Sequence, residues 1–173
     1  LHLGINGDKV YKLAAGYIYG EIGITWPTAN IEKPTDGMGL FTNVTGSTPA
    51  AGAEAFIDVP TGEIWKIHNL FINLITDATA GSRRVHFTYD DGTGSIRDFL
   101  APIDQIASEN KNYSGWSGIQ YGPTDNGNDI IVALPNDFYL TPGMRLKTST
   151  LNRAGGDQFG GMQVQAEKWY TPV

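Results

Sequence analysis

The sequence predicts an all-β protein, a jelly-roll-like antiparallel β-sandwich that follows an extended N-terminal arm. Short runs rich in β-branched and aromatic residues recur at the spacing of about 8–12 residues that is typical of sandwiches, with turn residues between them. The 173 residues include 22 glycines, and only 17% are charged, against roughly 25% in an average domain. No helix-rich segment is present that could cover a sheet. These observations favour strands and turns over an α/β layout.

Residues 1–52 differ from the rest, and we expect an extended arm with short strands. Gly or Pro interrupts this stretch every few residues, which argues against a long helix. Apolar side chains stand between these breakers, and they must be buried on the arm's own domain or on a neighbour. The predicted interface residues are Tyr17, Tyr19, Ile22, Ile24 and Trp26. Residues 45–52, "TGSTPAAG", have the composition of a hinge.

Residues 53–173 are predicted to form the sandwich. The expected strands lie at residues 53–60, 63–76, 84–89, 95–100, 113–121, 129–134, 144–151 and 162–169. The run "EIWKIHNLFINLIT" fits a helical face as well, but its β-branched and aromatic content and its flanking turns favour a strand. In the last strand Met162, Val164 and Ala166 alternate with polar residues, which predicts one buried face.

The sequence predicts the structure of some connections between these strands and leaves another open. Two stretches are rich in residues that favour tight turns, and each predicts a hairpin. They are "DDGTG" at residues 90–94 and "GPTDNGN" at residues 122–128. Residues 102–110, "PIDQIASEN", fit a short helix or a strand, and both stay open.

Composition excludes several classes of function. The chain has no cysteine, so disulfides and thiolate metal sites are excluded, and stability must come from packing or assembly. The formal net charge of −6 argues against a nucleic-acid partner, which requires a surplus of Lys and Arg on one face. No stretch approaches the ~20 apolar residues that a membrane-spanning helix needs, so we expect no membrane partner.

Histidines offer little for a metal centre, and we expect no metal and no other cofactor. The chain has His2, His68 and His86 alone, whereas a zinc site needs three or four converging ligands. His68 and His86 are expected on adjacent strands and could form a pair. We favour the interpretation that each is a partly exposed strand residue.

Two acidic loops, "YDDGTG" and "PTDNGND", could hold calcium through clustered oxygens. Asp125, Asn126 and Asp129 do not follow the order of an EF-hand loop, because Ile130 stands where glycine is required. Turn formation explains the Asp-Gly and Asn-Gly pairs without an ion.

The sequence predicts no enzyme. The stretch "SGWSG" at residues 114–118 is similar at a glance to a nucleophile elbow, but Ser117 is followed at once by Gly118 and no helix follows. Phosphate-binding glycine motifs are also missing.

Aromatic residues near this stretch raise a carbohydrate-binding alternative. Tyr113, Trp116 and Tyr121 could form a platform for a sugar. Aromatic residues on strands are more often core or interface residues, which is the competing interpretation.

Two stretches resemble small bacteriophage structural proteins. The first is "VPTGEIWKIHNLFINLITDATAGSRRVHFTYDDG", in which a Pro-x-Gly turn, a Trp-containing strand and a Thr/Ala/Gly turn lead into a strand that opens with Arg. The second is "ALPNDFYLTPGMRLKTSTLNRAGGDQFGGMQVQAEKW", with a Pro-Gly turn and a Gly-Asp loop before the last strand. The resemblance covers residues 56–169, interrupted in the middle, and does not extend to the arm.

This resemblance implies a non-enzymatic virion protein, most simply a capsid decoration or cement subunit. The implied partners are further copies of the chain, as a homotrimer, and the major capsid protein or other virion proteins. A tail or fibre component that contacts the host surface is the alternative. Within this family Arg83 and Arg84 open a strand, where long stems cover apolar surface and the guanidinium groups meet carboxylates. Both arginines are therefore predicted at a strand end or a subunit contact.

Overall fold

The structure is a computed structural model that describes residues 2–5, 9–14, 17–19, 38–118 and 127–170. It divides into two compact units, Leu1–Lys33 and Pro34–Val173. The first unit holds one antiparallel sheet of β1 (His2–Ile5), β2 (Lys9–Ala14) and β3 (Tyr17–Tyr19), in the order β1-β2-β3.

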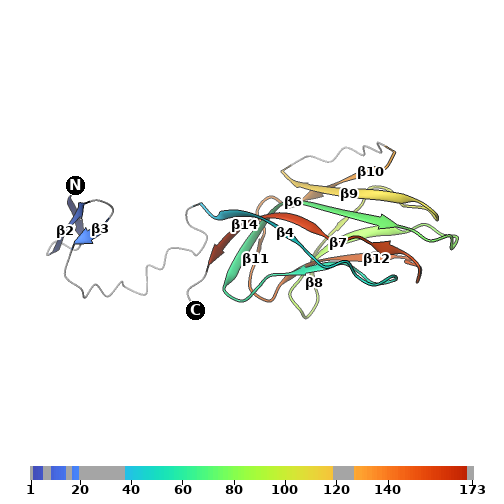
Figure 1. The fold of residues 1–173 in the computed structure, drawn as a ribbon, viewed down its shortest axis with the longest axis horizontal. Coiled ribbons are helices and arrows are strands. Elements are labelled where there is room, and N and C mark those ends of the chain that lie inside the picture. Colours follow the sequence, from blue (N-terminus) through green and yellow to red (C-terminus); the bar gives the residue numbers. More distant parts are fainter. Residues whose placement is uncertain (1, 6–8, 15–16, 20–37, 119–126, 171–173) are drawn as a thin grey trace. The chain divides into compact units, whose positions relative to one another are not determined.

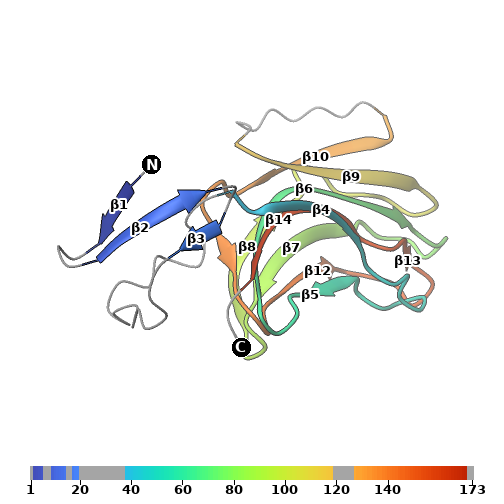
Figure 2. The same ribbon diagram turned by 60° about the vertical axis from the view of Figure 1, so that its left-hand side comes forward.

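The second unit is a sandwich of two sheets, shown as layers in Figure 1 and Figure 2. The larger sheet has the order β10-β9-β6-β14-β4, with β11 and β13 also paired to β6. Its strands are β4 (Leu40–Thr45), β6 (Glu63–Ile75), β9 (Asn110–Ser117), β10 (Asp129–Leu134), β11 (Tyr139–Leu140), β13 (Gln158–Phe159) and β14 (Gln163–Tyr170). The smaller sheet has the order β5-β12-β7-β8, with β5 (Phe56–Asp58), β7 (Arg84–Asp90), β8 (Ser95–Leu100) and β12 (Arg145–Leu151). The predicted all-β sandwich is confirmed.

Side-chain alternation places the core between the two sheets. Along β7 the residues Val85, Phe87 and Tyr89 are buried and point inward, as the period of a strand requires. The rings of Phe87 and Tyr113 meet edge to face across the two sheets, with centroids 6.1 Å apart. Each large apolar side chain buried in this way contributes roughly 1.5–3 kcal/mol. The predicted inward face of the last strand is also confirmed, since Val164 and Ala166 are buried.

The long apolar run that fitted both a helix and a strand is the strand β6, at the centre of the larger sheet. Its pairing with β14 shifts by one residue, because Asn69 pairs with Gln165 and Ile67 pairs with Ala166. His68 is therefore the extra residue of a β-bulge, which interrupts the alternation that a regular strand would show. No helix long and apolar enough to cross a bilayer occurs among the described residues.

The hairpin predicted around residues 122–128 is wrong. Strands β9 and β10 are neighbours, but they run parallel, with Asp129 opposite Asn112 and Leu134 opposite Ser117. A two-residue hairpin turn joins antiparallel strands only, so the parallel pairing of β9 and β10 rules out a hairpin between them. The alternation of side chains is the same in both directions, and the sequence pattern therefore did not distinguish them.

The sandwich also begins earlier than predicted. Strand β4, placed in the arm by the sequence, pairs along its whole length with β14. The predicted hinge at residues 45–52 is anchored to the sandwich, since Gly46 N donates to Met162 O at 2.7 Å and Gly52 N donates to Asp157 O at 2.7 Å. The boundary between the compact units lies at Lys33 and Pro34 instead of residues 52 and 53. Residues 102–109 form neither a helix nor a strand, and an isolated bridge joins Gln105 to Arg83, whereas Asn110 is the first residue of β9.

Candidate functional site

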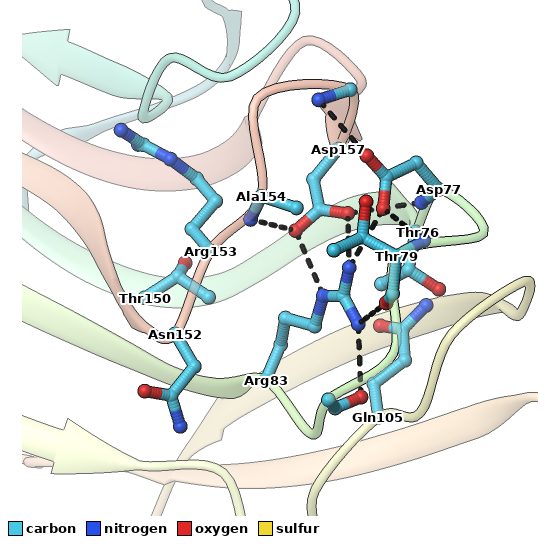
Figure 3. A network of polar contacts seen from close by, with 12 residues as sticks. Thr76, Asp77, Thr79, Arg83, Gln105, Thr150, Asn152, Arg153, Ala154 and Asp157 are labelled. Atoms are coloured by element: carbon cyan, nitrogen blue, oxygen red, sulfur yellow. Dashed lines mark hydrogen bonds and ion pairs between the residues drawn. The ribbon is translucent and has the colours of Figure 1, made fainter.

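The two adjacent arginines occupy different environments, and Arg83 is the buried one. Its side chain is 1% exposed, although it lies immediately before β7, in an isolated bridge with Gln105. The guanidinium forms a bidentate ion pair with Asp157, with Nε to Oδ2 at 3.0 Å and Nη2 to Oδ1 at 3.1 Å (Figure 3). Nη2 also donates to Asp77 Oδ1 at 2.8 Å. This arrangement has the geometry of the strongest charged hydrogen bonds in proteins.

All donors of the Arg83 guanidinium are used. Nη1 donates to the carbonyl oxygens of Thr79 at 2.8 Å and Gly81 at 2.9 Å, within the turn that precedes β7. A guanidinium has five N–H donors, and the carboxylates and carbonyls accept all of them. The hydrogen bond with Asp157 raises the pKa of Arg83 despite its burial.

Asp157 is held from several sides. It is fully buried and accepts hydrogen bonds from the backbone N–H of Ala154 at 2.7 Å and of Asp77 at 2.9 Å, in addition to those from Arg83. Burial alone would raise the pKa of Asp157, but the hydrogen bonds from Arg83, Ala154 and Asp77 outweigh it, and the pKa is lowered. Arg83, Asp77 and Asp157 together form what we call the Arg83 clamp. It joins the turn before β7 to the loop before β13.

Arg84 lies on the opposite face of the strand. It forms an ion pair with Asp104, and its side chain is 34% exposed. Of the two predicted contact residues, Arg84 is therefore accessible to a partner, and Arg83 is not. The prediction that the arginines meet carboxylates at a strand end is confirmed for both, whereas a contact role for Arg83 is wrong because solvent does not reach it.

The predicted sugar platform is not a single surface. Tyr113 is fully buried, and its hydroxyl donates to Gln105 Oε1 at 2.9 Å. Burial also raises its pKa. Trp116, three residues further along β9, points to the opposite face and is 50% exposed. Tyr113 is thus a core residue, while Tyr121 lies outside the described residues.

The predicted arm residues are only partly described. Tyr17 and Tyr19 are the first and last residues of β3, of which only the backbone is described. Ile22, Ile24 and Trp26 lie outside the described residues, so the arm interface stays a prediction.

The histidines that could have formed a metal pair lie in different sheets. His68 is on β6 and His86 is on β7, so the expectation of adjacent strands is wrong. His68 Nε2 lies 3.1 Å from Glu167 Oε2, and His2 belongs to β1 in the other compact unit. Within the ranges that the structure describes, no group of three or more His, Asp or Glu side chains could hold a metal ion.

The first acidic loop is explained by its own hydrogen bonds. Asp91 Oδ1 accepts from the N–H and hydroxyl of Thr93, at 2.9 Å and 2.6 Å, and from Gly94 N at 3.0 Å. Such bonds are typical of Asp in turns. In the second loop Asp125 and Asn126 lie outside the described residues, and Asp129 accepts from Asn112 Nδ2 at 2.9 Å.

The stretch "SGWSG" is a regular part of β9 up to Ser117, and not a strained elbow. Gly115 faces the core, where a Cβ would lie 2.9 Å from Leu70 and 3.1 Å from Leu134. Glycine at this position permits close packing of β9 against both side chains. Packing alone therefore explains why residue 115 is a glycine, and no catalytic role is needed.

The outer face of the larger sheet carries an uncharged polar surface, which we call the amide face. Pairing registers and exposure place its members on one side of neighbouring strands: Asn43 and Thr45 on β4, Gln163 and Gln165 on β14, Asn69, Phe71 and Asn73 on β6, and Asn110, Asn112, Ser114 and Trp116 on β9. None of these side chains is charged, but charged residues border them on the same face: Asp129 on β10 accepts from Asn112, and Glu167 on β14 lies opposite Lys66 on β6. The signal for this face in the sequence is the period-two spacing of Asn69, Phe71 and Asn73, which was not among the predicted sites.

Hydrogen bonds between strands hold part of this face in place. Asn69 Nδ2 donates to Gln165 Oε1 at 3.1 Å, and Gln165 N donates to Asn69 Oδ1 at 3.2 Å. Asn73 Nδ2 donates to Asn112 Oδ1 at 3.2 Å and also contacts Asn110 Oδ1. A hollow of about 210 Å³ lies beside these pairs, lined by Asn43, Val44, Thr45, Asn69, Phe71, Gln163, Val164 and Gln165.

Comparisons with known proteins add little to this geometry. No protein-family model matches the chain, and no curated protein matches it. A solved structure described as that of PfGH50B is similar over 78% of this chain and 23% of its own length, with 9% sequence identity and a TM-score of 0.31. A similarity this distant carries no argument about function.

Proposed function

We propose that this protein is a non-enzymatic structural component of a bacteriophage virion, a subunit that decorates or cements the capsid. The proposal rests on the Arg83 clamp. The turn at residues 76–82, the Arg-opened strand β7 and the Gly-Asp loop before β13 are the sequence features that resemble phage structural proteins. All three meet at the clamp, where Asp77, Arg83 and Asp157 are in contact (Figure 3).

This convergence supports a structural role because the shared features form a framework. Arg83 has every donor occupied by protein groups, and both it and Asp157 are shielded from solvent, so neither is available to a substrate. Proteins that share a fold are expected to share the buried residues that hold it together, as the residues of the Arg83 clamp do.

The small N-terminal unit supports assembly with partners. Its sheet has strands of four, six and three residues, and the chain has no cysteine that could cross-link it. Units below about 40 residues need disulfides, metals or association to be stable. A neighbouring copy, the major capsid protein or another virion protein would supply that association.

Light scattering and co-sedimentation test this function. The full-length protein at micromolar concentration should be an oligomer, most simply a homotrimer, and should sediment with phage capsids. Antibody labelling of virions should mark the head, whereas labelling of the tail would favour the alternative of a tail or fibre component. A chain that stays monomeric at 18.7 kDa and does not sediment with particles would contradict the proposal.

A further inference from the structure

We propose that the amide face binds an uncharged glycan chain, which lies across the strands from Trp116 to the hollow beside Phe71. This proposal concerns the outer face of the larger sheet and does not depend on the virion role. The proposed surface differs from the sugar platform of Tyr113, Trp116 and Tyr121 that the sequence predicted. Tyr113 is in the core, and the polar contacts come from amide side chains on four strands instead.

The members of the amide face are uncharged, and the charged residues that border them on the same side are Asp129, next to Asn112, and the opposed pair Glu167 and Lys66. The chain carries 12 Lys and Arg and 18 Asp and Glu, yet the members of the amide face are only amide, hydroxyl and aromatic side chains. A phosphate, sulfate or carboxylate ligand would find no cation among these members to compensate its desolvation, and it would approach the carboxylates of Asp129 and Glu167 at the border. Hydroxyl groups both donate and accept hydrogen bonds, as amides do, so a neutral sugar is complementary.

The amides are oriented before a ligand arrives. Asn69 Nδ2 donates to the side-chain carbonyl of Gln165, and the backbone N–H of Gln165 donates to the side-chain carbonyl of Asn69. An Asn side chain has two N–H donors and an oxygen with two lone pairs, so each amide retains bonding capacity beyond these contacts. Groups held by their neighbours lose less conformational entropy when they bind.

Two aromatic side chains complete the surface. Trp116 is 50% exposed and lies opposite Asn69 on the neighbouring strand, and Phe71 is 40% exposed and follows Asn69 on the same face. Ligand sites typically combine aromatic walls with a few fixed polar groups, and the C–H face of a sugar ring packs on an aromatic ring. The hollow of about 210 Å³ adjoins Phe71.

The dimensions of the face favour a chain over a single sugar. Strand β9, with Trp116, is separated from β4, with Asn43, by β6 and β14. Three strand spacings amount to roughly 14 Å. The ligand is therefore expected to be an oligosaccharide or a polysaccharide segment that contacts several strands at once.

The test uses the full-length protein on an array of neutral and anionic glycans, followed by isothermal titration with the best neutral oligosaccharide. Trp116→Ala and Gln163→Ala should each weaken binding, Trp116→Ala by roughly tenfold or more. Gln163 is exposed and lines the hollow, so its truncation should leave the fold intact, as circular dichroism would verify.

A matched pair of phenylalanines provides the control. Phe71 is 40% exposed on the amide face, and Phe56 is 46% exposed on the smaller sheet. Phe71→Ala should weaken glycan binding, while Phe56→Ala should leave it unchanged. The proposal is overturned if no neutral glycan binds, if only anionic glycans bind, or if the two Phe variants behave alike. If the wild type binds no glycan and Trp116→Ala loses self-association, Trp116 belongs to a protein interface, and the proposal is also overturned.

Discussion

Arg83 and Asp157 form a buried bidentate ion pair between segments that lie 74 residues apart in the chain. The pair fixes the start of β7 against the loop before β13. Because β7 belongs to the smaller sheet and β13 pairs with the larger one, the contact also links the two layers of the sandwich. An ion pair inside a protein is costly to desolvate, and it is retained here with all guanidinium donors satisfied.

Removal of Arg83 should therefore destabilise the fold strongly. Arg83→Ala leaves the carboxylate of Asp157 buried without its cation, and loss of one partner of such a pair typically costs about 3–5 kcal/mol. The free energy of unfolding in urea measures the effect. Arg84→Ala is the matched control, since its partly exposed ion pair with Asp104 should contribute at most about 1 kcal/mol. Equal losses in the two variants would contradict the clamp.

Several predictions from the sequence succeeded because strand alternation is a local property. The inward set Val85, Phe87 and Tyr89 follows from period two alone. The same rule places Arg83 and Arg84 on opposite faces, but the identity of the buried one depends on Asp157, far away in the sequence. Local patterns do not contain that information.

Other features depended on which strands become neighbours. Strand β10 runs parallel to β9, and alternation cannot reveal the direction of a strand. The stretch of β4 was assigned to the arm because Val44 is its one apolar side chain that packs against the core, while Leu40 and Phe41 are exposed. The amide face appears only when strands from distant parts of the chain are aligned, which explains why the sequence indicated Trp116 and not Asn69.

Acid should destabilise the protein through carboxyl groups whose pKa is lowered in the fold. Hydroxyl groups of Ser95 and Thr88 donate to Asp98 and lower its pKa, and the hydrogen bond from Lys147 lowers that of Asp90. A carboxyl with a lower pKa in the folded than in the unfolded chain stabilises the fold above its unfolded pKa, near pH 4. That stabilisation is lost as the pH falls through the folded pKa.

The unfolding free energy should thus be constant near neutral pH and should decrease below about pH 4. Urea titrations between pH 7 and pH 2 measure this profile. Asp98→Asn keeps an oxygen for Ser95 and Thr88 but removes the titration, so its profile should be shallower than that of the wild type. An identical slope in the variant would show that Asp98 does not contribute.

Packing at Gly115 should tolerate no side chain. A Cβ at this position would lie 2.9 Å from Leu70 and 3.1 Å from Leu134, both in the core. Gly115→Ala should lower stability by about 1–3 kcal/mol, the usual cost of overpacking. Gly94→Ala is the control, because a Cβ added at Gly94 would have nothing within 4 Å. Thermal unfolding compares the two variants.

Metal removal should leave stability unchanged. Oδ1 of Asp91 already accepts hydrogen bonds from Thr93 and Gly94, and no group of three or more acidic or histidine side chains among the described residues could hold a metal ion. The melting temperature should be the same with EDTA and with added calcium. A shift of several degrees would indicate a bound ion and would direct attention to Asp125, Asn126 and Asp129.

Two truncations should separate assembly from folding. A chain that lacks residues 1–37 retains β4, whose pairing with β14 runs from Leu40 to Thr45. It should unfold cooperatively near the temperature of the full-length protein, but it should no longer assemble if the N-terminal unit docks on a partner.

Removal of residues 1–50 also deletes β4, so it exposes the edge of β14 and the core contact of Val44. The loss of ladder hydrogen bonds and of this burial should cost roughly 2–4 kcal/mol. Circular dichroism and sedimentation of both truncations give the two readouts. If the chain without residues 1–37 unfolds, the N-terminal unit contributes to the sandwich core, and if it still assembles, the contact lies elsewhere, with Arg84 as the first residue to test. If the two truncations are equally stable, β4 does not protect the edge of the sheet.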